Sequence, residues 1–275
     1  MMKIQINGTS VEARPGEFLL AVAARHGIDI PALCHHEAVE PTGNCRMCLV
    51  EITKPSWDGW AKLVTACLYP SEPDLIVTTH SPRVMEARAV LVDLLLARCP
   101  DSRYVQELAA EYGVTQTSYE PAPTPTEQCI LCGLCVRVCE KLGPTAIATI
   151  QRGGRKKVGG PYDGPPPDCI GCASCAEVCP TKCITVVEAA GRRRIWERDF
   201  ELLRCQACGR GLVTVDEARY FAAKAGLGET YYDLCDACKV RRTAQQNLKI
   251  SGLPTERRTA SPTTDRAAAS LPTER

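Results

Sequence analysis

The chain has 275 residues, a formal net charge of +1 and eighteen cysteines. This near-neutral charge creates no overall field that would favour nucleic acid or an acidic membrane surface. Repeated Cys-x-x-Cys pairs at metal-ligand spacing favour metal sites over disulfides, which predicts a reducing, cytoplasmic location. The N-terminus has no apolar signal core, and the longest apolar run, 89–97, is too short to span a bilayer, so direct membrane insertion is not expected.

Residues 1–80 are expected to form a small domain of strands around one helix. Strands at 3–6 and 11–13 flank Asn7-Gly8, a strong hairpin signal. Residues 17–26 carry apolar side chains at helical spacing and end at Gly27. Further short strands are predicted at 48–52, 63–66 and 75–79.

Residues 81–127 are expected to form a helical connector followed by a linker. Pro82 opens a predicted helix at 83–97, and a second helix at 102–112 ends at Gly113. Residues 118–126 are rich in proline, which indicates an extended linker.

The first cysteine quartet predicts a two-iron cluster. A close pair, one distant upstream thiol and one far downstream thiol suit a flat [2Fe-2S] cluster held in a loop. Gly43 allows the backbone to approach this cluster, so that amide groups can bond the sulfurs. His35 and His36 are expected to be polar neighbours rather than ligands. The predicted ligands are Cys34, Cys45, Cys48 and Cys67.

Residues 128–190 predict a domain with two four-iron clusters, because the pattern C-x2-C-x2-C-x3-C occurs twice. The fourth thiolate of each run is expected to bind the other cluster, since it lies on a helical turn that points away. Zinc ligands usually come in distant pairs, which argues against eight zinc ligands here. The predicted ligands are Cys129, Cys132, Cys135 and Cys179 for cluster A, and Cys169, Cys172, Cys175 and Cys139 for cluster B.

The basic residues between the two runs are interpreted as a solvated face, with a docking surface for an acidic partner as the alternative. They are Arg152, Arg155, Lys156 and Lys157. Cys99 and Cys183 fall outside every quartet and are expected to be packing residues.

Residues 191–250 predict a metal-binding module with an internal helix at 216–225. Two distant Cys-x-x-Cys knuckles are the usual arrangement of a structural zinc ion, and a third [4Fe-4S] cluster or a single iron is the alternative. The ligands would be Cys205, Cys208, Cys235 and Cys238. Residues 251–275 are rich in Pro, Thr, Ser, Ala and Arg, which predicts a disordered tail.

The N-terminal half resembles a known family. Ile30-Pro31-Ala32-Leu33-Cys34, the stretch from Gly43 to Glu51, and the run from Cys129 to Glu140 resemble the N-terminal region of the large iron–sulfur subunit of complex I and the diaphorase iron–sulfur subunit of NAD-reducing hydrogenases. The resemblance covers roughly residues 1–190 and implies a β-grasp [2Fe-2S] ferredoxin domain. Relatives commonly carry a four-iron cluster held by one histidine and three cysteines, and residues 94–107 offer one cysteine and no histidine. That cluster is expected to be absent.

These motifs predict an α+β electron-transfer subunit rather than a catalytic one. No Rossmann fingerprint, P-loop or catalytic triad is evident. The expected partners are a flavin- and NAD(P)-linked subunit on one side and a hydrogenase, formate dehydrogenase or other reductase subunit on the other. Two alternatives stay open: a stand-alone iron–sulfur oxidoreductase, and a metal-stabilised regulatory or nucleic-acid-binding protein that uses Arg210, Lys239, Arg241 and Arg242.

Overall fold

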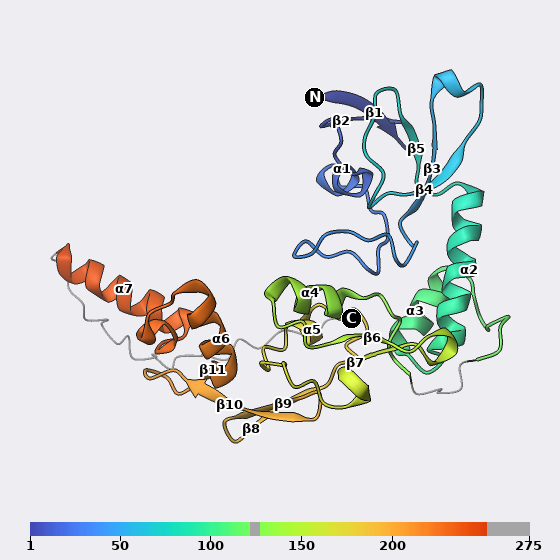
Figure 1. Cartoon of the computed structure of the whole chain (residues 1–275). Coiled ribbons are helices and arrows are strands. Elements are labelled where there is room, and N and C mark those ends of the chain that lie inside the picture. Colours follow the sequence, from blue (N-terminus) through green and yellow to red (C-terminus); the bar gives the residue numbers. More distant parts are fainter. Residues whose placement is uncertain (122–126, 252–275) are drawn as a thin grey trace, which may run out of the picture.

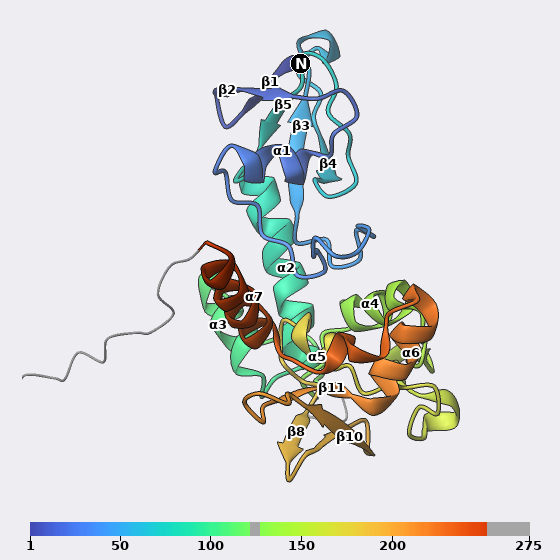
Figure 2. The same cartoon turned by 90° about the vertical axis from the view of Figure 1, so that its left-hand side faces the viewer.

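The computed structural model describes residues 1–121 and 127–251. A five-stranded sheet domain stands above a cysteine-rich body, and a long helix runs between them (Figures 1 and 2). The mixed α+β class expected from the sequence is confirmed. Part of the predicted linker, 122–126, and all of the predicted tail except Ser251 lie outside the described residues.

The N-terminal domain is a mixed sheet with one covering helix. Its strand order is β2-β1-β5-β3-β4, in which β1 and β5 are parallel and the other neighbours are antiparallel. Asn7 and Gly8 form the predicted turn, with φ of 51° and 80°. The elements are β1 (Met2–Ile6), β2 (Thr9–Ala13), α1 (Leu19–Arg25), β3 (Leu49–Thr53), β4 (Lys62–Thr65) and β5 (Ile76–Thr78).

Alternation along the strands creates the core of this domain. Ile4 and Ile6 on β1 are buried, as are Val11 and Ala13 on β2, because alternate side chains of a strand point to the same face. The helix α1 begins at Leu19, two residues later than predicted, since Phe18 is still extended and pairs with Pro70.

Helix α2 (Pro82–Arg98) connects the two parts of the molecule. Ser81 caps it by accepting a 3.3 Å hydrogen bond from the Val84 amide, and a helix of this length spans about 25 Å. From the middle of the helix, Arg88 Nη2 donates to the Leu49 carbonyl, next to Cys48, at 2.7 Å. At the end of the helix, Arg98 Nε donates to the Cys129 carbonyl at 2.7 Å. Helix α2 is therefore hydrogen-bonded to two different cysteine motifs.

Helix α3 (Arg103–Glu111) packs against α2, and the cysteine-rich body follows. Among the described residues, the body contains four α-helices, a hairpin and a four-stranded sheet of order β11-β10-β9-β8. Its elements are α4 (Leu134–Leu142), β6 (Ala148–Ile150), β7 (Lys157–Gly159), α5 (Ser174–Glu177), β8 (Val186–Ala189), β9 (Arg192–Ile195), β10 (Arg198–Arg204), β11 (Gly211–Thr214), α6 (Val215–Ala225) and α7 (Asp236–Ile250).

The C-terminal part differs from the sequence expectation in two ways. The sequence pattern predicts α6 but neither β6–β11 nor α7. The position expected to separate two modules, residue 190, lies in the turn between β8 and β9. One sheet therefore joins the segments 128–190 and 191–250.

No helix within residues 1–121 and 127–251 is long and apolar enough to cross a membrane.

Candidate metal centres

The first quartet gathers where a long loop meets the strands of the N-terminal sheet. Cys34 and Cys45 lie in that loop, Cys48 directly precedes β3, and Cys67 follows β4. The thiols lie in two neighbouring pairs, Cys34 with Cys45 and Cys48 with Cys67, and the Cys45 amide donates to Cys34 Sγ at 3.3 Å. Two irons that each take two thiolates need two such pairs, so the donor set fits a [2Fe-2S] cluster.

Hydrogen bonds lower the pKa of one thiol of each pair and raise that of its partner, Cys45 or Cys48. The Cys45 thiol and then the amides of Cys45 and Asn44 lower the pKa of the Cys34 thiol to about 5. A hydrogen bond from the Cys48 thiol lowers the pKa of Cys67, and the amide of Gly43 lowers it further. Gly43 has φ of 63°, and a Cβ there would come within 2.6 Å of Leu68 Cδ1. The positive φ at Gly43 therefore favours glycine, and its amide approaches the Cys67 sulfur.

The eight thiols of the two runs divide between two cavities in a crossed way. A cavity of about 530 Å³ is lined by Cys129, Cys132 and Cys135 from the first run, and by Cys179 from the second. A smaller cavity is lined by Cys169, Cys172 and Cys175, and by Cys139 from the first run. These are the two ligand sets that the sequence pattern predicts.

The walls of these cavities suit iron–sulfur clusters. The smaller cavity is otherwise lined mainly by apolar side chains such as Ile147, Ile170 and Ile195. Backbone amides approach the thiols, since Ala146 donates to Cys139 Sγ at 3.3 Å and Gly171 donates to Cys169 Sγ at 3.4 Å. Such hydrogen bonds stabilise cluster sulfurs.

Cys183 lies beside the larger cavity, whereas the sequence pattern gives it only a packing role. Its Sγ is 3.6 Å from Cys179 Sγ, and it lines the same cavity. Its hydrogen bonds lower the pKa of Cys179 to about 5 and that of Cys129 to about 7. Its place four residues after Cys179, just beyond Pro180, was the only sequence signal of this proximity.

Cys99, which lies outside every quartet, is fully buried. Its Sγ donates to the Cys129 carbonyl at 3.5 Å, and burial raises the pKa of its thiol to about 12. The packing role expected for Cys99 agrees with this environment.

The last quartet is much more compact than the others. The four Sγ atoms of Cys205, Cys208, Cys235 and Cys238 lie within 4.8 Å of one another, and Cys208 Sγ is 3.8 Å from Cys235 Sγ. No other group of metal-ligating side chains in the described part of the chain is this tight. Hydrogen bonding from the Cys235 amide lowers the pKa of Cys205 to about 6. Hydrogen bonds to the neighbouring thiols raise the pKa of Cys238 to about 12, so the compact geometry rather than thiol acidity marks this site.

Two side-chain contacts join the first quartet to the body below it. Arg137, between Cys135 and Cys139, donates to the carbonyl of Cys34 at 2.7 Å and to that of Glu40 at 2.6 Å. Asn44 Nδ2 donates to the Leu131 carbonyl at 2.9 Å. The loop of the first quartet is therefore held against the first four-iron run.

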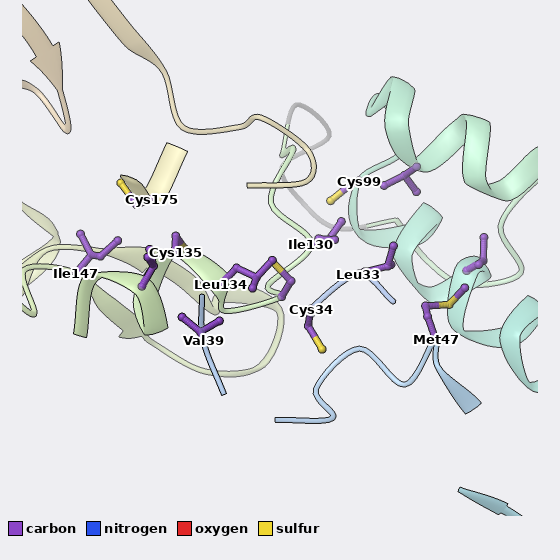
Figure 3. Close-up of a cluster of buried hydrophobic side chains, with 14 of the residues drawn as sticks. Leu33, Cys34, Val39, Met47, Cys99, Ile130, Leu134, Cys135, Ile147 and Cys175 are labelled. Atoms are coloured by element: carbon purple, nitrogen blue, oxygen red, sulfur yellow. The ribbon is translucent and has the colours of Figure 1, made fainter. Parts of the chain in front are cut away.

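A shared apolar core reinforces this junction (Figure 3). It contains Leu33, Val39 and Met47 from the loop of the first quartet. It also contains a cysteine from each of the three quartets of residues 34–179, namely Cys34, Cys135 and Cys175. The three candidate centres thus surround one continuous core.

Comparison with known proteins supports the first of these centres. Residues 1–82 match the family described as "2Fe-2S iron-sulfur cluster binding domain". The chain is 30% identical over 236 residues to one of the NADH-quinone oxidoreductase subunits of Rhizobium meliloti, an alignment that covers 77% of this chain and 27% of that protein. It is 27% identical over 259 residues to a subunit of the NADP-reducing hydrogenase of Solidesulfovibrio fructosivorans, covering 83% of this chain and 42% of that protein.

A solved structure, that of an NAD+-reducing [NiFe]-hydrogenase in the H2-reduced state, shares 26% identity with a TM-score of 0.50. The likeness covers 58% of this chain and 75% of that chain. The chain spans only 27% of the length of the Rhizobium meliloti relative, so it corresponds to one part of that protein. The chain is similar to subunits of NADH-quinone oxidoreductases and NAD(P)-reducing hydrogenases, and its residues 1–82 match a two-iron domain, as the motif around Cys34, Cys45 and Cys48 predicted.

Proposed function

We propose that this chain is an electron-transfer subunit of a multi-subunit oxidoreductase. The observation that carries the proposal is the shared core, in which cysteines of three quartets pack together around one junction. Electron carriers need redox centres that are close together and shielded from water, and apolar packing between the quartets supplies both conditions. The relatives are subunits of NAD(P)-linked oxidoreductases and hydrogenases, which supports the same role here.

The ligand assignment follows from donor chemistry and placement. Cys34, Cys45, Cys48 and Cys67 would hold one [2Fe-2S] cluster. Two [4Fe-4S] clusters would occupy the two cavities, with the crossed ligands Cys179 and Cys139. When bound, these clusters would supply one-electron transfer. The apolar side chains around them would exclude water, and backbone amides would donate hydrogen bonds to the ligand sulfurs.

The compact fourth quartet supports zinc. Tetrahedral zinc with bonds of about 2.3 Å to sulfur places its thiolates about 3.8 Å apart. The distance between Cys208 Sγ and Cys235 Sγ is 3.8 Å. A four-iron cluster would force its thiolates much further apart, because its own irons and sulfides lie between them. We therefore assign this site to a structural zinc ion.

The partners and the location are part of the same proposal. A flavin- and NAD(P)-linked subunit would lie at one end of the electron path, and a hydrogenase or other reductase subunit at the other. The many reduced thiols fit the cytoplasm.

Metal analysis with EPR of the full chain tests this function. Anaerobically purified protein is expected to contain about ten irons and about one zinc, with one two-iron and two four-iron signals after reduction. Purified alone, the chain should not reduce a dye with NADH, and it should transfer electrons only when a partner subunit is added. About fourteen irons without zinc would overturn the zinc assignment, and dye reduction by the chain alone would make it an enzyme in its own right.

A further inference from the structure

The hairpin formed by β9 and β10 lies over the second four-iron run, and its turn is unusual. Ile195 pairs with Arg198, so Trp196 and Glu197 are the two turn residues, with φ of 52° and 61°. Turns of this kind favour Asn and Gly, because other side chains are strained at positive φ. A tryptophan at such a position indicates that its side chain makes contacts that offset the strain.

The indole of Trp196 bonds directly to a predicted cluster ligand. Its Nε1–H donates to Cys175 Sγ at 3.4 Å. In the loaded protein this sulfur would be an iron-bound thiolate, which is a stronger acceptor than a thiol because it carries negative charge. Trp196 also lines both cavities, so its ring lies between the two predicted four-iron centres.

Other side chains of the same sheet fix the hairpin against this run. Arg198 Nη1 approaches the carbonyls of Pro166, Pro167 and Cys169 at 2.8, 2.6 and 2.8 Å. Arg193 Nη1 donates to the carbonyl of Gly171 at 2.8 Å. Because these contacts fix the loop just before Cys175, the indole is held in one position relative to the thiol.

Phe200 of β10 packs closely against Gly171, in the loop between Cys169 and Cys172. A Cβ on Gly171 would lie 2.6 Å from Phe200 Cγ, and Gly171 has φ of 70°. Only glycine therefore lets the loop between Cys169 and Cys172 lie this near the sheet.

The two predicted four-iron centres differ in whether a side-chain N–H group donates a hydrogen bond to one of their thiols. Among residues 1–121 and 127–251, no side-chain nitrogen donates to the sulfur of Cys129, Cys132, Cys135 or Cys179. At the larger cavity, the hydroxyl of Thr181 and the thiol of Cys183 lie within hydrogen-bond distance of Cys179 Sγ instead.

We propose that Trp196 is a positioning residue that raises the reduction potential of the centre held by Cys139, Cys169, Cys172 and Cys175. An N–H group stabilises the reduced centre more than the oxidised one, because the reduced centre puts more negative charge on its sulfurs. The indole keeps its proton and takes no electron. This inference rests on the proposed function for the presence of the clusters.

The test is an EPR-monitored redox titration of the full chain with Trp196→Phe, which keeps an aromatic ring and removes the N–H. The ratio of reduced to oxidised cluster B at a fixed potential is expected to fall at least threefold, about 28 mV for a one-electron couple. The two-iron centre and cluster A should titrate as in the parent chain. Trp60→Phe is the matched control, because Trp60 is 57% exposed on the N-terminal domain.

A second measurement needs no substitution in the site. Pulsed EPR on protein labelled with 15N-tryptophan is expected to show a nitrogen coupling to reduced cluster B. The Trp60→Phe control should retain this coupling. Lack of that coupling, or an unchanged potential in Trp196→Phe, overturns the inference while leaving the proposed function intact. Lack of any reduced four-iron signal in the parent chain overturns the proposed function itself.

Discussion

At the residue scale, Cys139 distinguishes the crossed ligand arrangement from one in which each run binds only its own cluster. It lies on α4 in the first run, yet it lines the cavity of the second run. Cys139→Ser should therefore damage cluster B and leave cluster A, which iron analysis and EPR can separate. Cys99→Ala is the control, because Cys99 is a buried thiol outside every quartet. Selective loss of cluster A would contradict the crossed assignment.

Cys183 leads to a second prediction at the same scale. Because its Sγ is 3.6 Å from Cys179 Sγ, it is within reach of the iron that Cys179 would bind. Cys179→Ala is expected to retain most of cluster A with an altered EPR signal, whereas Cys179→Ala combined with Cys183→Ala should lose it. Cys132→Ala has no such neighbouring thiol and serves as the comparison. Equal loss from Cys179→Ala and from the double variant would show that Cys183 cannot replace the ligand.

At the scale of elements, α4 and the first cysteine loop are joined by Arg137. Arg137→Met keeps the aliphatic stem and removes both hydrogen bonds to the loop. Hydrogen bonds from a charged group contribute about 1.5–3 kcal/mol each, and partial exposure reduces this, so a loss of about 2 kcal/mol is expected. The loss should appear as faster hydrogen exchange in residues 34–45 with unchanged iron content.

Arg155→Met is the matched control for this prediction, since Arg155 is an exposed arginine of the same body. Similar exchange rates in the two variants would mean that apolar packing alone holds the loop against α4.

The elements also show what local sequence can and cannot specify. The Asn7-Gly8 hairpin and α2 were predictable, because turn chemistry and helical spacing are local signals. The β9–β10 hairpin was not, because its arginines look like solvent-facing residues. Arg193 and Arg198 instead donate to carbonyls of the second run, which lies more than 20 residues earlier. Helix α7 was missed for a different reason: nearly all of its residues are exposed, so it has little apolar periodicity.

The candidate sites were more predictable than the fold around them. Ligand spacing within each run is local, so the sequence predicts the membership of every quartet. The structure brings the predicted sets between Cys129 and Cys238 together in two cavities and one compact group. The environments of Cys183 and Trp196 depend on contacts between distant segments. Such contacts leave no periodic pattern in the chain.

At the scale of the whole molecule, the zinc candidate is linked to cluster B. Strand β10 ends at Arg204, directly before Cys205, and β11 begins at Gly211, shortly after Cys208. The opposite ends of these strands hold the second run through Arg198 and Thr214, whose hydroxyl donates to the Ile170 carbonyl. A metal at Cys205–Cys208 would therefore clamp the sheet that covers cluster B.

This link predicts a selective effect of metal loss. Cys208→Ser, at the one exposed ligand of the site, should speed the release of iron from cluster B several-fold and change that from cluster A much less. Iron release to a chelator, followed by EPR of each cluster, measures the difference. Arg241→Ala, an exposed change in the same module, is the control. Equal acceleration for both clusters would show that the zinc site stabilises the body as a whole.

The crossed lining of the two cavities has a consequence for how the protein is made. Each run contributes three thiols to one cavity and one thiol to the other. With the ligands proposed above, a newly synthesised chain could not complete its first four-iron centre until the second run, some 40 residues later, had emerged and folded back. A chain truncated between the runs would lack the Cys179 ligand of that centre.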